Sequence, residues 1–258
     1  MLKKIENYIL ACCAMRRLNL KGCPFLPKAF TRLPIYNRSR FNTFITWIKI
    51  LQLGQARWMV DAGANHGDFS HAASACFPSA RCLLVEPLPQ LHGQLEKRCN
   101  GSREHWFLEK CALGATNCVM PFYVARSDEI GSLAGFSEEY AAVIAGAKPS
   151  SQFECQVRTL DAVAAQHGIA AIDLLKIDVE GFEFEVLEGA REALAKTEAV
   201  IVEVSLVRNP SRHSSALLRM LNLLADAGFD IVRVIPSLFD RREPWKPVEF
   251  NILARRST

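Results

Sequence analysis

The sequence predicts an α/β domain with a mostly parallel sheet and helices on both of its faces. From residue 57 onward, short apolar runs typical of buried strands alternate with segments of helical periodicity. A glycine-rich turn follows the first of these runs, as in sheets that bind ligands beyond their strand ends. The last two runs have no helix between them, which predicts that the final strand is antiparallel. With 258 residues, half of them hydrophobic, the chain can bury such a core.

The alternation of expected strands and helices begins at residue 57. Strands are predicted at apolar runs that are rich in β-branched residues or bounded by Pro and Gly, namely 58–60, 82–86, 106–108, 119–124, 153–157, 174–178, 200–204, 229–234 and 248–253. Helices are predicted where apolar residues recur every three or four positions, namely 68–77, 88–99, 160–167, 182–194 and 214–227. Residues 126–152, rich in Gly, Ser and Ala, are predicted as a loop with one short helix.

Residues 1–56 are predicted as an N-terminal helical extension to a domain spanning 57–258. Pro24, Pro27 and Pro34 interrupt the helical pattern, and the clearest helix covers 41–53. The apolar run 8–15 is too short to span a membrane, although a weak contact of the N-terminus with a membrane surface stays open. No residue pattern in this extension indicates chemistry.

The composition limits which binding partners and which cellular compartment are expected. The net charge is only +4, with basic residues gathered near the two ends of the chain, so a solvated surface is expected and a nucleic-acid partner is not. The nine cysteines form no C-x-x-C pair and show no zinc spacing, which predicts reduced thiols and a cytoplasmic protein. Nothing in the sequence indicates an oligomeric state.

The turn Asp61-Ala62-Gly63-Ala64-Asn65-His66-Gly67 is the first candidate binding segment. Its glycines let the backbone turn sharply and let a ligand approach closely. The G-x-G-x-x-G pattern for a pyrophosphate is absent, and an acid before the turn suits an ammonium group better than a phosphate. We therefore expect Asp61, Gly63, Asn65 and Gly67 to bind a cofactor with a positive end, and His66 to be an exposed turn residue.

Glu86 ends the second predicted strand, about 20 residues after the turn, where a ribose diol requires a carboxylate acceptor. A turn suited to an ammonium group and a ribose acceptor in register together predict S-adenosylmethionine as the cofactor. Adenine is expected at the end of the third strand. Glu109, Lys110 and Cys111 occupy that place, and Cys111 is retained as the candidate contact.

Five blocks, in order over residues 57–254, resemble the FkbM-type methyltransferases. They are Asp61 to Gly67, Val85-Glu86-Pro87, Thr159-Leu160-Asp161, Leu175-Lys176-Ile177-Asp178-Val179-Glu180-Gly181-Phe182-Glu183 and Ile201-Val202-Glu203. The resemblance implies a class I methyltransferase (Rossmann-like) fold with a seven-stranded sheet, and O-methylation of sugar or natural-product hydroxyls. It also implies that Asp61, Gly63, Asn65 and Glu86 contact the cofactor. Ala62 replaces the usual valine, and in 126–152 only Gly131-Ser132 matches, which makes Ser132 a candidate substrate contact.

The 174–178 strand carries the candidate catalytic residues. Lys176 and Asp178 point to the same side of a strand, and Glu180 follows. Methyl transfer to a hydroxyl benefits from a base on its proton, so Asp178 and Glu180 are candidates for the base or a substrate anchor. Lys176 would neutralise developing oxyanion charge or pair with Asp178. Glu203, ending the next strand, is expected to line the acceptor pocket.

Two other interpretations of this cluster stay open. Lys176, Asp178 and Glu180 could form a purely structural ion-pair cluster. Asp178, Glu180 and Glu203 could hold Mg²⁺, although the expected reaction requires no metal.

The sequence thus predicts an S-adenosylmethionine-dependent O-methyltransferase whose acceptor is a hydroxyl of a sugar, glycan or natural product. One alternative is a nucleic-acid methyltransferase, but the Asn/Asp-Pro-Pro-aromatic tetrapeptide is absent from the chain. The other is a non-catalytic cofactor-binding module of the same fold, which the intact block 176–181 disfavours.

Overall fold

The computed structural model describes residues 35–101, 105–125, 130–143, 148–207 and 215–257. By its internal contacts the chain divides into residues 1–38 and a compact unit, Ser39–Thr258, which contains both sheets and the candidate site residues. The three prolines of the predicted extension and the apolar run 8–15 lie outside the described residues. No helix among those described is long and apolar enough to cross a membrane.

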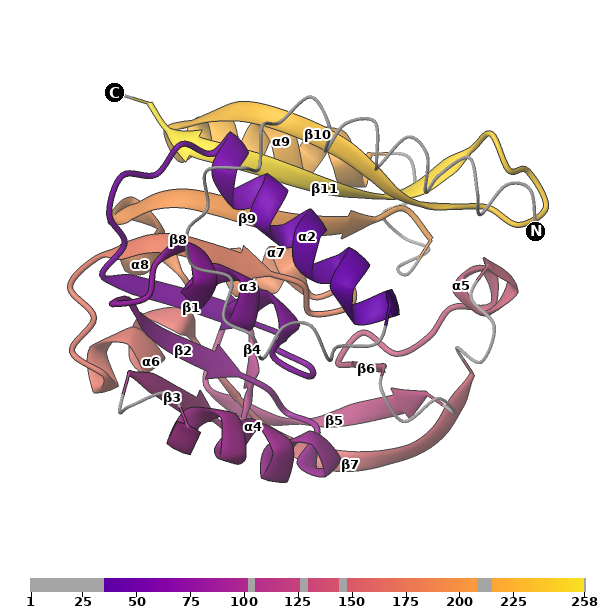
Figure 1. The fold of residues 1–258 in the computed structure, drawn as a ribbon. Coiled ribbons are helices and arrows are strands. Elements are labelled where there is room, and N and C mark those ends of the chain that lie inside the picture. Colours follow the sequence, from indigo (N-terminus) through magenta and orange to yellow (C-terminus); the bar gives the residue numbers. More distant parts are fainter. Residues whose placement is uncertain (1–34, 102–104, 126–129, 144–147, 208–214, 258) are drawn as a thin grey trace. The chain divides into compact units, whose positions relative to one another are not determined.

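The main sheet has seven strands in the order β10-β11-β9-β8-β1-β2-β3 (Figure 1). They are β1 (Trp58–Ala62), β2 (Arg81–Val85), β3 (Trp106–Glu109), β8 (Ile172–Ile177), β9 (Thr197–Ser205), β10 (Phe229–Phe239) and β11 (Pro247–Arg256). The five neighbouring strands β9, β8, β1, β2 and β3 pair in parallel. Strand β11 pairs antiparallel with both β9 and β10. The predicted fold class is confirmed, including the antiparallel last strand.

The strand order reverses between β1 and β8. The chain runs outward from β1 through β2 to β3, and later returns to place β8 on the other side of β1. Such a switch point leaves a crevice at the carboxyl ends of the two central strands, because the connections leave in opposite directions there. The register pairs Asp61 of β1 with Lys176 of β8, so residues more than a hundred positions apart lie side by side.

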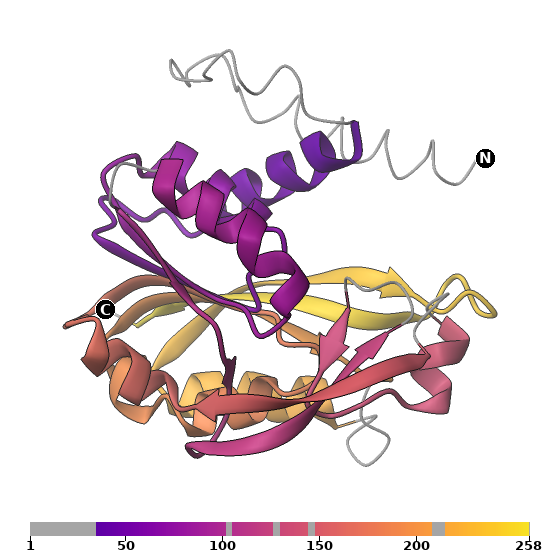
Figure 2. The ribbon, with the colours of Figure 1, turned by 90° about the horizontal axis from the view of Figure 1, so that it is seen from below.

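Helices cover both faces of this sheet (Figure 2). One face carries α2 (Ile35–Ile50, from Ser39 on), α3 (Asp68–Cys76) and α4 (Pro89–Gly101), and the other carries α6 (Leu160–Gln166), α7 (Glu183–Glu188), α8 (Arg191–Ala195) and α9 (Ala216–Asp226). Phe41, Phe44 and Ile48 of α2 are all buried, and the Phe44 ring meets the Phe69 ring of α3 edge-on at 5.4 Å. The helix expected at 41–53 is therefore present, although it ends at Ile50, and from Ser39 on it packs into the same compact unit as the sheet. The division at residue 56 stays a prediction.

A second, four-stranded sheet was not predicted. It has the order β4-β7-β5-β6 and consists of β4 (Ala112–Leu113), β5 (Cys118–Ala125), β6 (Gly131–Ser132) and β7 (Pro149–Arg158). The region expected to be a loop with one helix contains α5 (Glu138–Val143), but also β6 and the start of β7. Gly131 passes so close to Phe122 that a Cβ atom there would lie 2.2 Å from the ring. Only glycine therefore fits at the start of β6.

The helix expected at 182–194 is two helices, α7 and α8. The break falls at Gly189, where a Cβ atom would lie 2.1 Å from the carbonyl oxygen of Gly114. Asp161 then caps the second helix, because its Oδ1 accepts a hydrogen bond from the Ala193 N–H at 2.8 Å. The close approach of Gly189 to Gly114 and the cap from Asp161 thus divide a segment whose apolar periodicity predicts one continuous helix.

Candidate active site

A pocket opens at the carboxyl ends of β1, β2 and β8 and encloses about 830 Å³, including space open to solvent. Its walls are the turn after β1, the segments after β2 and β3, and the chain from Lys176 to Phe182. Phe122 and Leu133 of the second sheet region and Arg40 and Phe44 of α2 complete them. The switch point of the main sheet is therefore the floor of a site that α2 and the second sheet region complete.

Gly63 sets the shape of the turn after β1. Its φ of 75° lies in the left-handed region, and a Cβ atom there would lie 1.9 Å from the carbonyl oxygen of Asp178. The N–H groups of Gly63 and Ala64 both donate to the Val85 carbonyl at 3.0 Å. The turn is thereby held between the ends of β2 and β8, and its backbone forms part of the pocket wall.

Glu86 is a carboxylate of fixed orientation on the wall. Its Oε2 accepts a hydrogen bond from the Asn65 N–H at 2.6 Å, and its Oε1 accepts one from the Leu88 N–H at 2.9 Å. Each oxygen keeps capacity for a second hydrogen bond. Burial raises the pKa of Glu86 to about 7, and the two N–H donors only partly oppose this rise. The residue has acceptor capacity for two neighbouring hydroxyl groups, which suits the ribose contact that the sequence predicts.

Asp61 lies beneath the pocket and not on its wall. It has no exposed surface, and its Oδ2 accepts hydrogen bonds from the Ser70 Oγ at 2.6 Å and the Ser70 N–H at 3.2 Å. Because Ser70 is in the first turn of α3, Asp61 caps that helix from the end of β1. Its Oδ1 faces Lys176 Nζ at 3.6 Å. Gly67, with φ 77°, is also buried, where it begins α3. Neither residue is among those that line the pocket.

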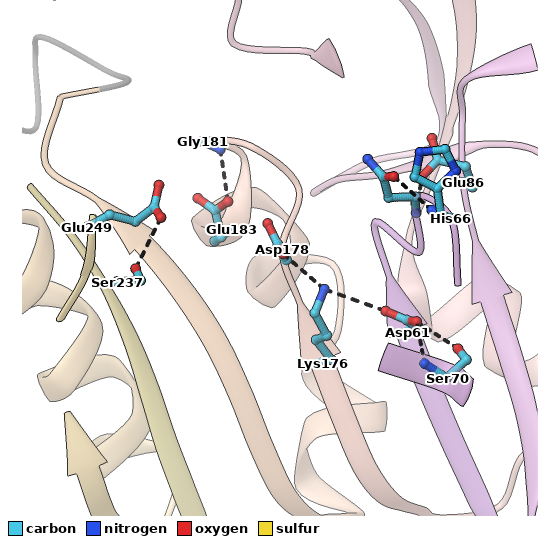
Figure 3. A network of polar contacts seen from close by, with 11 residues as sticks. Asp61, His66, Ser70, Glu86, Lys176, Asp178, Gly181, Glu183, Ser237 and Glu249 are labelled. Carbon is cyan, nitrogen blue, oxygen red and sulfur yellow. Dashed lines mark hydrogen bonds and ion pairs between the residues drawn. The ribbon is translucent and has the colours of Figure 1, made fainter. Parts of the chain in front are cut away.

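Lys176 joins Asp61 to Asp178 (Figure 3). Its Nζ donates to Asp178 Oδ2 at 3.1 Å and lies 5.7 Å from the centre of the Phe69 ring. Burial alone would lower the pKa of Lys176, but Asp178 and Asp61 outweigh that effect and raise it. A buried ammonium group is thus held between two carboxyl groups, and both Lys176 and Asp178 line the pocket.

Of three other predicted site residues, two line the pocket and one does not. Cys111 lines it, and burial raises the pKa of its thiol to about 12. Glu180 also lines it, with a left-handed φ of 61°. Ser132 is fully buried, and its Oγ donates to the Glu180 carbonyl at 2.7 Å and accepts from the Ala134 N–H at 3.0 Å. Ser132 thus ties the Glu180 segment to the second sheet instead of lining the pocket.

Glu203 belongs to a group of acids beside the pocket. Burial raises its pKa well above the usual range, and Asp178, Glu249 and Glu183 raise it further. Glu203 is not among the lining residues. Within the described ranges, no three His, Cys, Asp or Glu side chains are placed to hold a metal ion. Asp178, Glu180 and Glu203 therefore do not assemble the ligand set considered for Mg²⁺.

Sequence reasoning missed the residues that α2 and the second sheet bring to the pocket. Arg40, Phe44, Phe122 and Leu133 line it, and His66, expected to be an exposed turn residue, is half-buried on the wall. The helical spacing of Phe41, Phe44 and Ile48 does reveal a buried face. It does not reveal what that face covers.

The residues present fit S-adenosylmethionine. Glu86 can accept a ribose diol, and Gly63 lets the turn pack against the Asp178 backbone while it borders the pocket. Cys111, Ala112 and Leu113 offer an apolar wall beyond the end of β3. Together with the strand order and the antiparallel last strand, this site defines a class I, S-adenosylmethionine-dependent methyltransferase domain.

Comparison with known proteins gives the family. The family model described as "Methyltransferase FkbM domain" matches residues 61–231. The chain belongs to this family.

Three curated relatives are similar to the chain. The methyltransferase sdnD of Sordaria araneosa is 28% identical over 80% of this chain and 84% of its own. The 31-O-demethyl-FK506 methyltransferase FkbM of Streptomyces tacrolimicus is 30% identical over 69% of this chain and 75% of its own. The AMB antimetabolite synthetase AmbE of Pseudomonas aeruginosa is 26% identical over 67% of this chain, which spans only 9% of that synthetase.

Proposed function

We propose that this protein is an S-adenosylmethionine-dependent O-methyltransferase whose acceptor is a hydroxyl of a sugar, glycan or natural product. The observation that carries the proposal is Asp178 on the pocket wall, whose carboxylate lies 3.1 Å from the buried Lys176 ammonium group and whose backbone carbonyl packs against the Gly63 turn. A carboxylate in that position can take the proton of an acceptor hydroxyl as its oxygen is methylated.

Different residues of this chain orient the cofactor and handle the proton. When bound, S-adenosylmethionine supplies an electrophilic methyl group. Glu86 and the Gly63 turn orient the cofactor, and Asp178 holds the acceptor hydroxyl and takes its proton. Lys176 fixes the orientation of Asp178 and keeps positive charge next to the carboxylate that takes the proton. Phe44, on the α2 side, gives the pocket an apolar wall that limits access of water.

A relative supports the hydroxyl as the acceptor group. The name of the Streptomyces tacrolimicus protein describes a methyltransferase for a 31-O-demethyl compound, so methylation there is on oxygen. The name of the Sordaria araneosa protein specifies a methyltransferase without its acceptor. Oxygen is therefore the acceptor atom that this family resemblance favours for the present chain.

The proposal is tested by transfer of a labelled methyl group from S-adenosylmethionine to small-molecule and glycan fractions of a cell extract. We expect labelled products whose methyl group survives mild alkali, as an ether does and a carboxyl ester does not. Fragmentation of the product should place the added methyl on a former hydroxyl. Label that appears on nitrogen or sulfur, or only in nucleic acid, would contradict the proposal.

Asp178→Asn separates binding from chemistry. The amide keeps the shape of the side chain but cannot accept the proton, so turnover should fall by about 10²- to 10⁴-fold. Affinity for S-adenosylhomocysteine should change by less than about threefold, since cofactor binding does not require the base. Glu96→Gln, an equally conservative change at an exposed surface pair, is the control and should keep full turnover. Undiminished turnover of Asp178→Asn would make Asp178 a structural residue.

A further inference from the structure

Arg40 is an exposed arginine of α2 on the wall of the pocket. Its guanidinium carbon lies 6.0 Å from the centre of the Phe44 ring. Within the described part of the chain it makes no hydrogen bond or ion pair. An arginine placed at a pocket with only a ring contact has its full set of donors available for a ligand.

Two other cations near the pocket already have partners. Lys176 is held between Asp178 and Asp61. Arg98 donates to the Gly67 carbonyl at 3.2 Å and pairs with Asp68 at 3.5 Å. The pocket wall itself carries carboxyl groups, among them Asp178 and Glu86. An anionic group that enters this pocket therefore needs a cation that is not yet engaged.

Contacts place Arg40 at one particular end of the pocket. The Arg40 guanidinium lies over the Phe44 ring, Phe44 meets Phe69, and the Lys176 ammonium group on β8 lies over Phe69. Glu86 follows β2 and Cys111 follows β3, on the opposite side of β1. A cofactor with its ribose at Glu86 and its adenine toward Cys111 thus directs its amino-acid end toward β8 and α2.

We propose that Arg40 binds the carboxylate of the methionine moiety of S-adenosylmethionine, so that α2 forms part of the cofactor site. A guanidinium group can donate two parallel hydrogen bonds to a carboxylate, and the pair offsets the cost of bringing a negative charge among acidic side chains. The inference rests on the cofactor of the proposed function, but not on the identity of the acceptor. A carboxylate or phosphate on the acceptor offers Arg40 the same chemistry, and the experiment separates the two sources.

The test compares two ligands that differ in the amino-acid end. S-adenosylhomocysteine carries the carboxylate, whereas 5′-methylthioadenosine keeps the adenosine and the sulfur without it. Calorimetry on the full chain should show that Arg40→Gln weakens S-adenosylhomocysteine by about 10- to 100-fold, as expected for loss of a hydrogen-bonded charge pair. The affinity for 5′-methylthioadenosine should stay within about twofold. Arg40→Lys should retain part of the S-adenosylhomocysteine affinity, because lysine keeps the positive charge but cannot donate two parallel hydrogen bonds to the carboxylate.

Lys49→Gln is the matched control, since Lys49 is an exposed cation of the same helix that does not line the pocket. It should leave both affinities unchanged. Unaltered S-adenosylhomocysteine affinity in Arg40→Gln overturns the proposal, and a raised KM for the acceptor would then assign Arg40 to an acceptor anion. Equal weakening of both ligands also overturns it, because that result indicates a distorted helix. Failure of the wild-type chain to bind either ligand would instead contradict the cofactor site itself.

Discussion

At the scale of single residues, two backbone N–H groups hold the Glu86 carboxylate on the pocket wall, whereas Asp61 is fully buried. Gly63 and Glu86 lie on the pocket wall, and this position was predictable because a glycine turn and a strand-end carboxylate are visible in the sequence itself. Their contact with the cofactor stays a prediction. For Asp61, the observed partners differ from the predicted one. Its spacing indicated a ligand contact, but its carboxyl group caps α3 through Ser70 and faces Lys176. Partners supplied by other strands decide such a role, and they cannot be read from local sequence.

The raised pKa of Glu86 predicts a pH-dependent cofactor affinity. Its pKa in the folded chain, about 7, lies above the ordinary value of 4.5, so the folded state favours the protonated form between these values. The contribution of Glu86 to stability therefore falls as the pH rises from 4.5 through 7. Ribose hydroxyls donate best to the ionised form, so binding has the opposite trend. We expect affinity for S-adenosylhomocysteine to rise about tenfold from pH 6 to pH 8.

The controls for this pH dependence are two substitutions of buried glutamates. Glu86→Gln should weaken binding and flatten the profile, because the titrating group is gone. Glu183→Gln removes a second buried acid whose pKa burial also raises to about 7, but which is not on the pocket wall. That variant should keep the wild-type slope. A flat wild-type profile, or a slope that Glu183→Gln abolishes and Glu86→Gln does not, would contradict the assignment.

At the scale of elements, apolar periodicity predicted most strands and helices but not their partners. The runs 119–124 and 153–157 were correctly identified as strands, yet nothing in them tells that they pair with each other in a second sheet. The break between α7 and α8 depends on the backbone of Gly114, far away in the chain. Apolar periodicity indicates which side of a helix or strand is buried. Strand pairing and close backbone contacts depend on the neighbouring segment, which local periodicity does not identify.

The burial of α2 predicts that it stabilises the domain. Phe44 is 6% exposed and packs edge-on against Phe69 of α3. Phe44→Ala should therefore lower the free energy of unfolding by about 3 to 5 kcal/mol, the usual cost of emptying a buried phenylalanine site. Urea denaturation measures this change, with Lys49→Ala as the exposed control in the same helix, expected to cost less than about 0.5 kcal/mol. Equal stability of the two variants would mean that α2 is a dispensable extension.

At the scale of the whole molecule, one reversal of strand order produces the site. Because β8 returns to the side of β1 away from β2, the Gly63 turn, Glu86 and the Lys176–Asp178 pair converge on one pocket. The fold class and the gathering of these residues at one pocket were predictable, since each block of residues lies at a strand end. The walls that α2 and the second sheet supply were not, because their residues carry no spacing that relates them to the pocket.

The central claim is that the Gly63 turn and Glu86 bind S-adenosylmethionine at this reversal. Calorimetric titration of the full chain with S-adenosylhomocysteine tests it most directly. One site should be observed for the wild type, and Glu86→Ala should weaken it by about 10- to 100-fold, since hydrogen bonds to a charged group are lost. The surface variant Glu96→Gln should bind like the wild type. No binding by the wild type, or undiminished binding by Glu86→Ala, would contradict the account.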